Sequence, residues 1–198
     1  MRSPSSHESA ADDLVRLTRA TAAAMERATV ALEEADVALA DDIVADSVRL
    51  DREREELARQ VHTVLALRAP AVTVLAAIHA LTELERLSGL VLQVARAVQR
   101  AYPHPVVPHA LTPDFVELGR ITVWLVELAT DDDAHARASI RVEDDLADLR
   151  RILAALREPA DIAALSRVYE RFADHAVVLG RLMKSAVPVS SQATGTAA

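Results

Sequence analysis

Apolar residues recur every three or four positions along almost the whole chain, and this spacing strongly constrains the fold. Such a repeat marks one side of an α-helix that faces a core. Strand-forming aromatic residues make up only 3% of the chain, glycine occurs four times, and Ala, Leu, Arg and Glu dominate. Because these abundant residues favour helix over strand, the sequence predicts an all-α protein.

Prolines divide the helical pattern into two halves of three helices each. The stretch "YPHPVVPHALTP" at 102–113 holds four prolines in twelve residues, which predicts a linker. We expect helices at 10–35, 38–67, 70–100, 113–129, 134–156 and 161–183. Asp46 and Ser47 predict a restart or kink in the second helix, and Asp161 is the expected N-cap of the sixth.

The predicted domain organisation is a pair of tandem three-helix bundles. The first covers 10–101 and the second 114–183, with the proline-rich linker 102–113 between them. The terminal segments 1–9 and 184–198 are polar and patternless, so we expect them to be disordered.

A motif repeated in the two halves indicates an internal duplication. "LERLSG" at 84–89 and "YERFAD" at 169–174 both place a Glu-Arg pair on the third helix of a half. Glu85 follows Asp51 by 34 positions, whereas Glu170 follows Ala147, the apparent equivalent of Asp51, by only 23. The second bundle is therefore predicted to be shorter than the first.

Glu170 and Asp174 are the pair of residues that could carry chemistry. Four residues apart on a helix, they lie on one face about 5–6 Å from each other, and two carboxylates so placed can chelate a hard cation. The alternative is a solvated ion-pair network with nearby arginines, namely Arg167, Arg171 and Arg181. Spacing alone favours the ion-pair interpretation, because such pairs are common on surface helices.

Most other functional sites are absent from the sequence. The chain has no cysteine, and none of its seven histidines follows a glutamate by three positions, so thiolate sites and the Glu-x-x-His metal motif are excluded. His175 could be a ligand, but a lone histidine beside an apolar face is more often a buried, hydrogen-bonded residue. A net charge of −8 without a basic stripe argues against nucleic-acid binding.

No targeting or membrane segment is visible in the sequence. The first residues are polar and acidic, and the longest nearly apolar stretch, 69–81, is too short to span a bilayer. With no Gly-rich phosphate loop and no Gly-x-Ser-x-Gly motif either, we expect a cytoplasmic protein that is not an enzyme.

Several stretches together resemble the PhoU family of regulatory proteins associated with bacterial phosphate import. The resemblance covers about residues 10–183 and implies two similar three-helix bundles side by side. The stretches that carry it are "AMERATVALEEADVALADDIVADSVRLD" at 24–51, "LALRAPAV" at 65–72, "LERLSG" at 84–89, the linker with "ELGR" at 117–120, and "VYERFADHAV" at 168–177.

The resemblance also implies a metal site on the third helix of each bundle, built on a Glu-x-x-x-Asp motif. Glu170 and Asp174 match this motif, whereas in the first bundle Glu85 is followed by Gly89 instead of an acid. Ala147 also stands where the family usually places an aspartate on the preceding helix. Any bound metal, whether iron, zinc or magnesium, is therefore expected to be reduced or lost relative to the family.

Gly89 has a structural consequence as well. A glycine inside a helix costs about 0.5–1 kcal/mol relative to alanine. The small pair Ser88-Gly89 would, however, permit a close approach between helices.

The function implied by the resemblance is regulation by protein contact. Family members couple the ATPase subunit of the phosphate ABC transporter to a sensor histidine kinase that controls phosphate-starvation genes, and a homodimer is also implied. One alternative is a metal-dependent helical protein with storage or hydrolase chemistry at Glu170 and Asp174. Another is a degenerate scaffold that pairs with a regular PhoU protein.

Overall fold

Six α-helices make up the protein, as seen in a computed structural model that describes residues 6–63, 69–130, 132–156 and 159–187. No strand occurs in these ranges, which confirms the prediction of an all-α, six-helix fold. The α-helices are α1 (Ser6–Glu34), α2 (Val37–Thr63), α3 (Ala71–Ala101), α4 (Thr112–Glu127), α5 (Asp132–Ala155) and α6 (Ala160–Ala186). Two short 3₁₀-helices, η2 (His109–Leu111) and η3 (Leu128–Thr130), flank α4.

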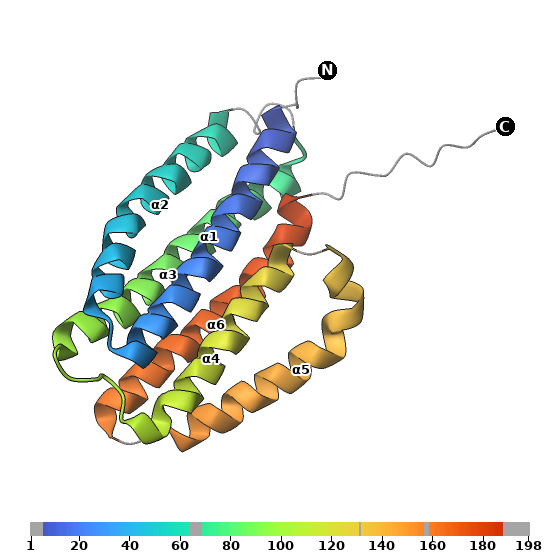
Figure 1. Cartoon of the computed structure of the whole chain (residues 1–198). Coiled ribbons are helices and arrows are strands. Elements are labelled where there is room, and N and C mark those ends of the chain that lie inside the picture. The colour runs from blue at the N-terminus through green and yellow to red at the C-terminus, as the bar shows by residue number, and fades with distance from the viewer. Residues whose placement is uncertain (1–5, 64–68, 131, 157–158, 188–198) are drawn as a thin grey trace.

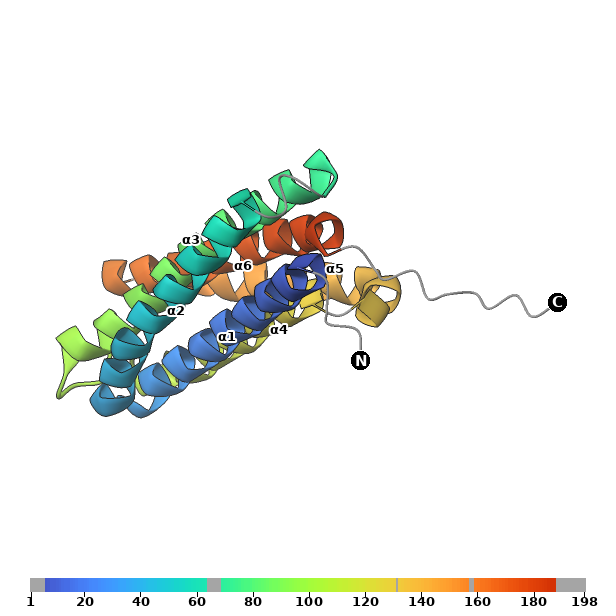
Figure 2. The ribbon, with the colours of Figure 1, turned by 90° about the horizontal axis from the view of Figure 1, so that it is seen from above.

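Four helices, α1, α3, α4 and α6, form the centre of the molecule, with α2 and α5 on opposite sides (Figure 1). The view from above shows the same long helices lying roughly alongside one another (Figure 2). One continuous apolar core passes through both halves of the chain. Among the described residues, α3 and α6 pack together more extensively than any other pair of helices. The two three-helix units are thus joined through α3 and α6.

The second three-helix unit is shorter than the first, as predicted. Helix α4 has 16 residues where α1 has 29, α5 has 24 where α2 has 27, and α6 has 27 where α3 has 31. The 3₁₀-helix η3 partly compensates by continuing the chain from the end of α4. The division into domains at 10–101 and 114–183 stays a prediction.

The turn between α1 and α2 has well-defined caps at both helix ends. Ala35 takes a left-handed conformation with φ of 53°, and the backbone N–H of Asp36 donates to the carbonyl of Ala31 at 2.9 Å. This is the arrangement of a Schellman motif. The side chain of Asp36 then accepts a hydrogen bond from the backbone N–H of Leu39 at 3.0 Å, which caps the start of α2.

A close approach between α1 and α4 positions the buried aromatic centre. A Cβ atom at Gly119 of α4 would lie only 2.5 Å from Thr29 Oγ1 of α1, so the two helices can meet there only because Gly119 has no side chain. Thr29 donates to the carbonyl of Met25 at 3.1 Å, which leaves the hydroxyl of Tyr169 to donate to Thr29 at 3.2 Å. Tyr169 also packs edge-on against Phe115 with ring centroids 5.6 Å apart.

Two predictions about helix boundaries are wrong. Helix α2 runs without interruption from Val37 to Thr63, because the hydroxyl of Ser47 donates to the carbonyl of Val44 inside the helix instead of capping a restart. Helix α6 begins at Ala160 after Pro159, which places Asp161 in its first turn and not at the N-cap.

The ends of the chain extend further into helix than the predicted bundle limits. Helix α1 begins at Ser6 and α6 ends at Ala186. The rest of the predicted disordered termini, 1–5 and 188–198, lies outside the described residues. No helix in the described ranges combines the length and apolarity that a membrane span needs.

Candidate functional site

Glu170 and Asp174 lie one turn apart on the exposed side of α6. Within the described part of the chain, neither carboxylate makes an ion pair or a hydrogen bond through its side chain. The solvated network with Arg167, Arg171 and Arg181 is therefore not formed, and that interpretation is wrong for the described residues.

The order of charges along the helix explains why these carboxylates are unpaired. Among the described residues, seven ion pairs join residues three apart on a helix, and in each of them the acid precedes the arginine. Helical side chains lean toward the N-terminus, so an arginine three positions later reaches back to the acid. In α6 the order is reversed, because Arg167 precedes Glu170 and Arg171 precedes Asp174. The two carboxylates are left available to groups from outside the chain.

The first copy of the motif is occupied differently. Glu85 on α3 is exposed, and its Oε2 accepts a hydrogen bond from Nη1 of Arg54 on α2 at 3.1 Å. Arg54 also lies 3.5 Å from Asp51. Glu85 is thus already paired with the guanidinium group of Arg54.

Gly89, four residues after Glu85, borders open space. A Cβ atom placed there would meet no atom within 4 Å. The expectation that Gly89 permits a close helix approach is therefore wrong. The close approach occurs instead at Gly119, which sequence spacing did not single out.

The acids near Ala147 on α5 do not complete a metal site with Glu170. Asp145 is buried, and its Oδ1 lies 3.4 Å from Nη2 of Arg120 on α4. Asp148 pairs with Arg151 on its own helix at 3.2 Å. Both acids are thus bound to arginines.

The described ranges show no assembled set of metal ligands around Glu170 and Asp174. These ranges contain no group of three or more His, Asp or Glu side chains placed to hold an ion. Hard divalent cations take six or more oxygen ligands, and Glu170 and Asp174 alone supply two carboxylates. A role for Glu170, Asp174 or Glu85 as a metal ligand stays a prediction.

A buried carboxylate joins the two halves next to this site, and sequence reasoning missed it. Glu83 of α3 is only 7% exposed, and its Oε2 lies 2.6 Å from Nδ1 of His175 on α6. Arg86 donates to the other oxygen of Glu83 at 2.6 Å. His175 is half-buried and hydrogen-bonded, as the structural interpretation of this residue expected.

The sequence does contain a signal for this contact. Glu83 shares the buried stripe of α3 with Ala76, Ala80 and Leu87. A carboxylate on such a stripe is costly to bury without a partner, which implies a cation or donor on the facing helix.

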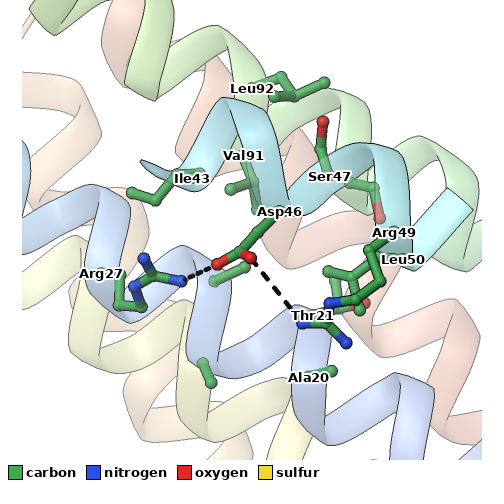
Figure 3. A pocket seen from close by; sticks show the side chains of 13 residues that line it. Ala20, Thr21, Arg27, Ile43, Asp46, Ser47, Arg49, Leu50, Val91 and Leu92 are labelled. Atoms are coloured by element: carbon green, nitrogen blue, oxygen red, sulfur yellow. Dashed lines mark hydrogen bonds and ion pairs between the residues drawn. The ribbon is translucent and has the colours of Figure 1, made fainter. Parts of the chain in front are cut away.

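A cavity of about 180 Å³ lies between α1, α2 and α3 (Figure 3). Its walls are mostly apolar, and small residues of α1 create the space, namely Ala20, Ala23 and Ala24. Asp46 at its edge accepts a hydrogen bond from Arg27 at 2.7 Å and lies 3.9 Å from Arg49. The hydrogen bond from Arg27 holds the pKa of Asp46 below its usual value. The lining offers space for a small apolar group, and the hydroxyl of Ser47 donates to the carbonyl of Val44.

Comparisons with known proteins connect both halves of the chain to one family. The family model described as "PhoU domain" matches residues 14–98. The "Phosphate-specific transport system accessory protein PhoU homolog 2" of Mycobacterium tuberculosis (strain ATCC 25618 / H37Rv) is 35% identical over 177 residues, which cover 80% of this chain and 83% of that protein. The corresponding "PhoU homolog 1" of Mycobacterium leprae (strain TN) is 33% identical over 192 residues, covering 87% and 84%.

A solved structure has the same fold. The crystal structure of PhoU from Pseudomonas aeruginosa matches with a TM-score of 0.67 over 92% of this chain and 97% of that one, at 20% sequence identity. At that identity the match supports the fold, while the mycobacterial relatives establish the relationship in sequence. The chain belongs to the PhoU family.

Proposed function

We propose that this protein is a non-catalytic cytoplasmic regulator of phosphate uptake and phosphate-starvation signalling. It acts by contact with the ATPase subunit of the phosphate ABC transporter, with a sensor histidine kinase, or with both. The observation that carries the proposal is the 35% identity to a phosphate-specific transport system accessory protein across 80% of the chain. A match of this extent includes both three-helix units and not only the segment matched by the family model.

The distribution of polar groups is consistent with a protein that works through its outer surfaces. The unpaired carboxylates Glu170 and Asp174 lie on an exposed helix face, and the chain as a whole has a net charge of −8. Exposed charges of this kind favour encounter with a basic partner surface and contribute to its selection.

Binding to the two partner classes tests the proposal. The purified chain is titrated by isothermal calorimetry against the phosphate transporter's ATPase subunit and against the cytoplasmic part of the kinase, each with and without phosphate. The ATPase subunit of an unrelated ABC importer serves as the control. We expect saturable binding to at least one of the two partners and none to the control. Absence of binding to both, under either phosphate condition, would contradict the proposal.

A further inference from the structure

A cleft of about 400 Å³ lies between the end of α4, the 3₁₀-helix η3, α5 and the second half of α6. Among the described residues, α5 packs against α4 and α6 much less extensively than α2 packs against α1 and α3. Figure 1 shows the middle of α5 standing away from α4. The volume is in the range of about 300–1,000 Å³ that is typical of small-molecule sites. We call this space the α5–α6 cleft.

Most of the lining of the α5–α6 cleft is apolar. Leu125 and Leu128 contribute to it from α4 and η3, and Val177 contributes from α6. Val142 and Leu146 lie one turn apart on α5 and form the opposite wall. None of the described residues that line the cleft is aromatic, so the walls offer no stacking partner for a ring. They favour a ligand with an alkyl chain, which binds by leaving water.

Two unpaired cations line the cleft toward the C-terminal end of α6. Val177, Arg181 and Lys184 are spaced by three or four residues, so they share one face of α6. Both cations are exposed, and in the described part of the chain neither side chain forms an ion pair or a hydrogen bond. Lys184 lies in the last turn of α6, where the helix dipole favours a cation, but Arg181 lies before that turn. The dipole therefore does not explain Arg181.

The charges in the lining favour a head group with one negative charge. Arg181 and Lys184 contribute two positive charges and Glu143 contributes one negative charge, which leaves a net charge of +1. A carboxylate carries one negative charge and accepts two hydrogen bonds from a single guanidinium group. A phosphate monoester carries about 1.5–2 negative charges at neutral pH, which is more than the lining balances.

We propose that the α5–α6 cleft binds an alkyl carboxylate of the fatty-acid class. The carboxylate pairs with Arg181 and Lys184, and the alkyl chain lies against the apolar walls of α4, α5 and α6. This site goes beyond the proposed function and does not depend on it, because a free fatty acid binds without any partner protein.

Calorimetric titration with decanoate tests the contact with the head group. The full chain is titrated below the concentration at which decanoate forms micelles. The double variant Arg181→Gln with Lys184→Gln removes both positive charges from the cleft. Arg171→Gln is the matched control, because Arg171 is an exposed and unpaired arginine of α6 that does not line the cleft.

A second pair of variants tests the space for the alkyl chain. Gly180 lines the cleft, so the side chain introduced by Gly180→Leu occupies part of it. Gly180→Ala is the control, because a Cβ atom at this position would lie 3.7 Å from the Cβ atom of Ala129, an ordinary contact. Circular dichroism checks that each variant is folded.

The wild type is expected to bind decanoate saturably at one site per chain. The dissociation constant should rise at least about tenfold in the double charge variant and in Gly180→Leu, and stay unchanged in both controls. Affinity should increase from hexanoate through octanoate to decanoate, by up to about fourfold for each CH₂ group that becomes buried. Decanol and decyl phosphate should both bind more weakly than decanoate.

Any one of four results would overturn the proposal. The first is the absence of saturable decanoate binding to the wild type. The second is equal affinity of the wild type for hexanoate and decanoate, a result that requires no variant. The third is unchanged affinity in the folded double charge variant or in folded Gly180→Leu, which would place the ligand elsewhere. The fourth is binding of decanol or decyl phosphate at least as tight as that of decanoate, which would refute the singly charged head group.

Discussion

Replacing Gly89 with alanine is expected to stabilise the protein. Gly89 lies inside α3, where glycine costs about 0.5–1 kcal/mol relative to alanine because it loses more backbone entropy on folding. A Cβ atom at this position would meet nothing within 4 Å, so no steric penalty offsets the gain. Gly89→Ala should therefore raise the free energy of unfolding by about 0.5–1 kcal/mol.

Gly119→Ala provides a matched control with the opposite sign. It gains the same helix propensity, but its new Cβ atom would lie 2.5 Å from Oγ1 and 2.6 Å from Cγ2 of Thr29. Thr29 is buried and β-branched, and its hydroxyl is held by Met25 and Tyr169, so it cannot rotate away cheaply. Overpacking of this kind costs about 1–3 kcal/mol, which exceeds the gain.

Urea denaturation of the wild type and the two variants measures both effects. In thermal denaturation of a protein of this size, a change of about 1 kcal/mol in the free energy of unfolding corresponds to a shift of about 2–4 °C in melting temperature. A Gly89→Ala variant that is less stable than the wild type would show that the space beside Gly89 is filled in solution. A Gly119→Ala variant at least as stable as the wild type would refute the close approach of α1 and α4.

Four further predictions follow from individual contacts. Ala35→Gly should raise the free energy of unfolding, measured by urea denaturation, by up to about 1 kcal/mol. Glycine takes the left-handed conformation at φ 53° without the steric cost that alanine bears. Unchanged or lower stability would contradict the left-handed conformation of this turn. A double-mutant cycle of Glu83→Ala and His175→Ala should give a coupling energy of about 0.5–3 kcal/mol, because the two side chains lie 2.6 Å apart between α3 and α6. A coupling energy near zero would mean that the pair does not form. Tyr169→Phe should cost about 0.5–1.5 kcal/mol at neutral pH through its lost hydrogen bond. Burial raises the pKa of the Tyr169 hydroxyl above its ordinary 10.0, so the unfolded chain loses this proton at a lower pH than the folded chain. The free energy of unfolding should therefore fall as pH rises above about 10, by up to about 1.4 kcal/mol per pH unit. Tyr169→Phe should reduce that slope, and equal slopes in the two proteins would argue against burial of the hydroxyl. Elemental analysis of the purified protein should find less than one metal ion per chain, with no difference in Asp174→Asn, and one tightly bound ion lost in that variant would restore the metal-site interpretation.

The helices and their grouping could be predicted from the sequence because the information is local. Apolar residues at helical spacing mark the side of each helix that faces the core, and the prolines at 102–113 separate the halves. The shorter second unit followed from the spacing between Glu170 and Ala147. Each of these inferences depends only on residues close together in the chain.

The wrong predictions arose where a residue had two local options. Ser47 can cap a new helix or donate to a carbonyl in its own helix, and the hydrogen bond to Val44 shows that it does the second. Asp161 is a good N-cap by type, but Pro159 and Ala160 begin the helix before it. Propensity alone does not choose between such options.

The site could be predicted only in part, because its environment comes from distant segments. Spacing placed Glu170 and Asp174 on one face, yet it did not show that reversed charge order leaves them without arginine partners. Glu83 and His175 are 92 residues apart, and their contact depends on how the two halves pack together. Tertiary packing also determines that Gly119, and not Gly89, lies at a close approach.

The proposed role of this protein is to regulate the response of the cell to phosphate. The most direct test is expression of a phosphate-starvation reporter in a strain that lacks the gene, compared with the same strain carrying the wild-type gene, in phosphate-rich medium. We expect a clear difference in reporter expression between the two strains, together with a difference in phosphate uptake. Equal expression and equal uptake in the two strains, with the protein verified as produced, would contradict it.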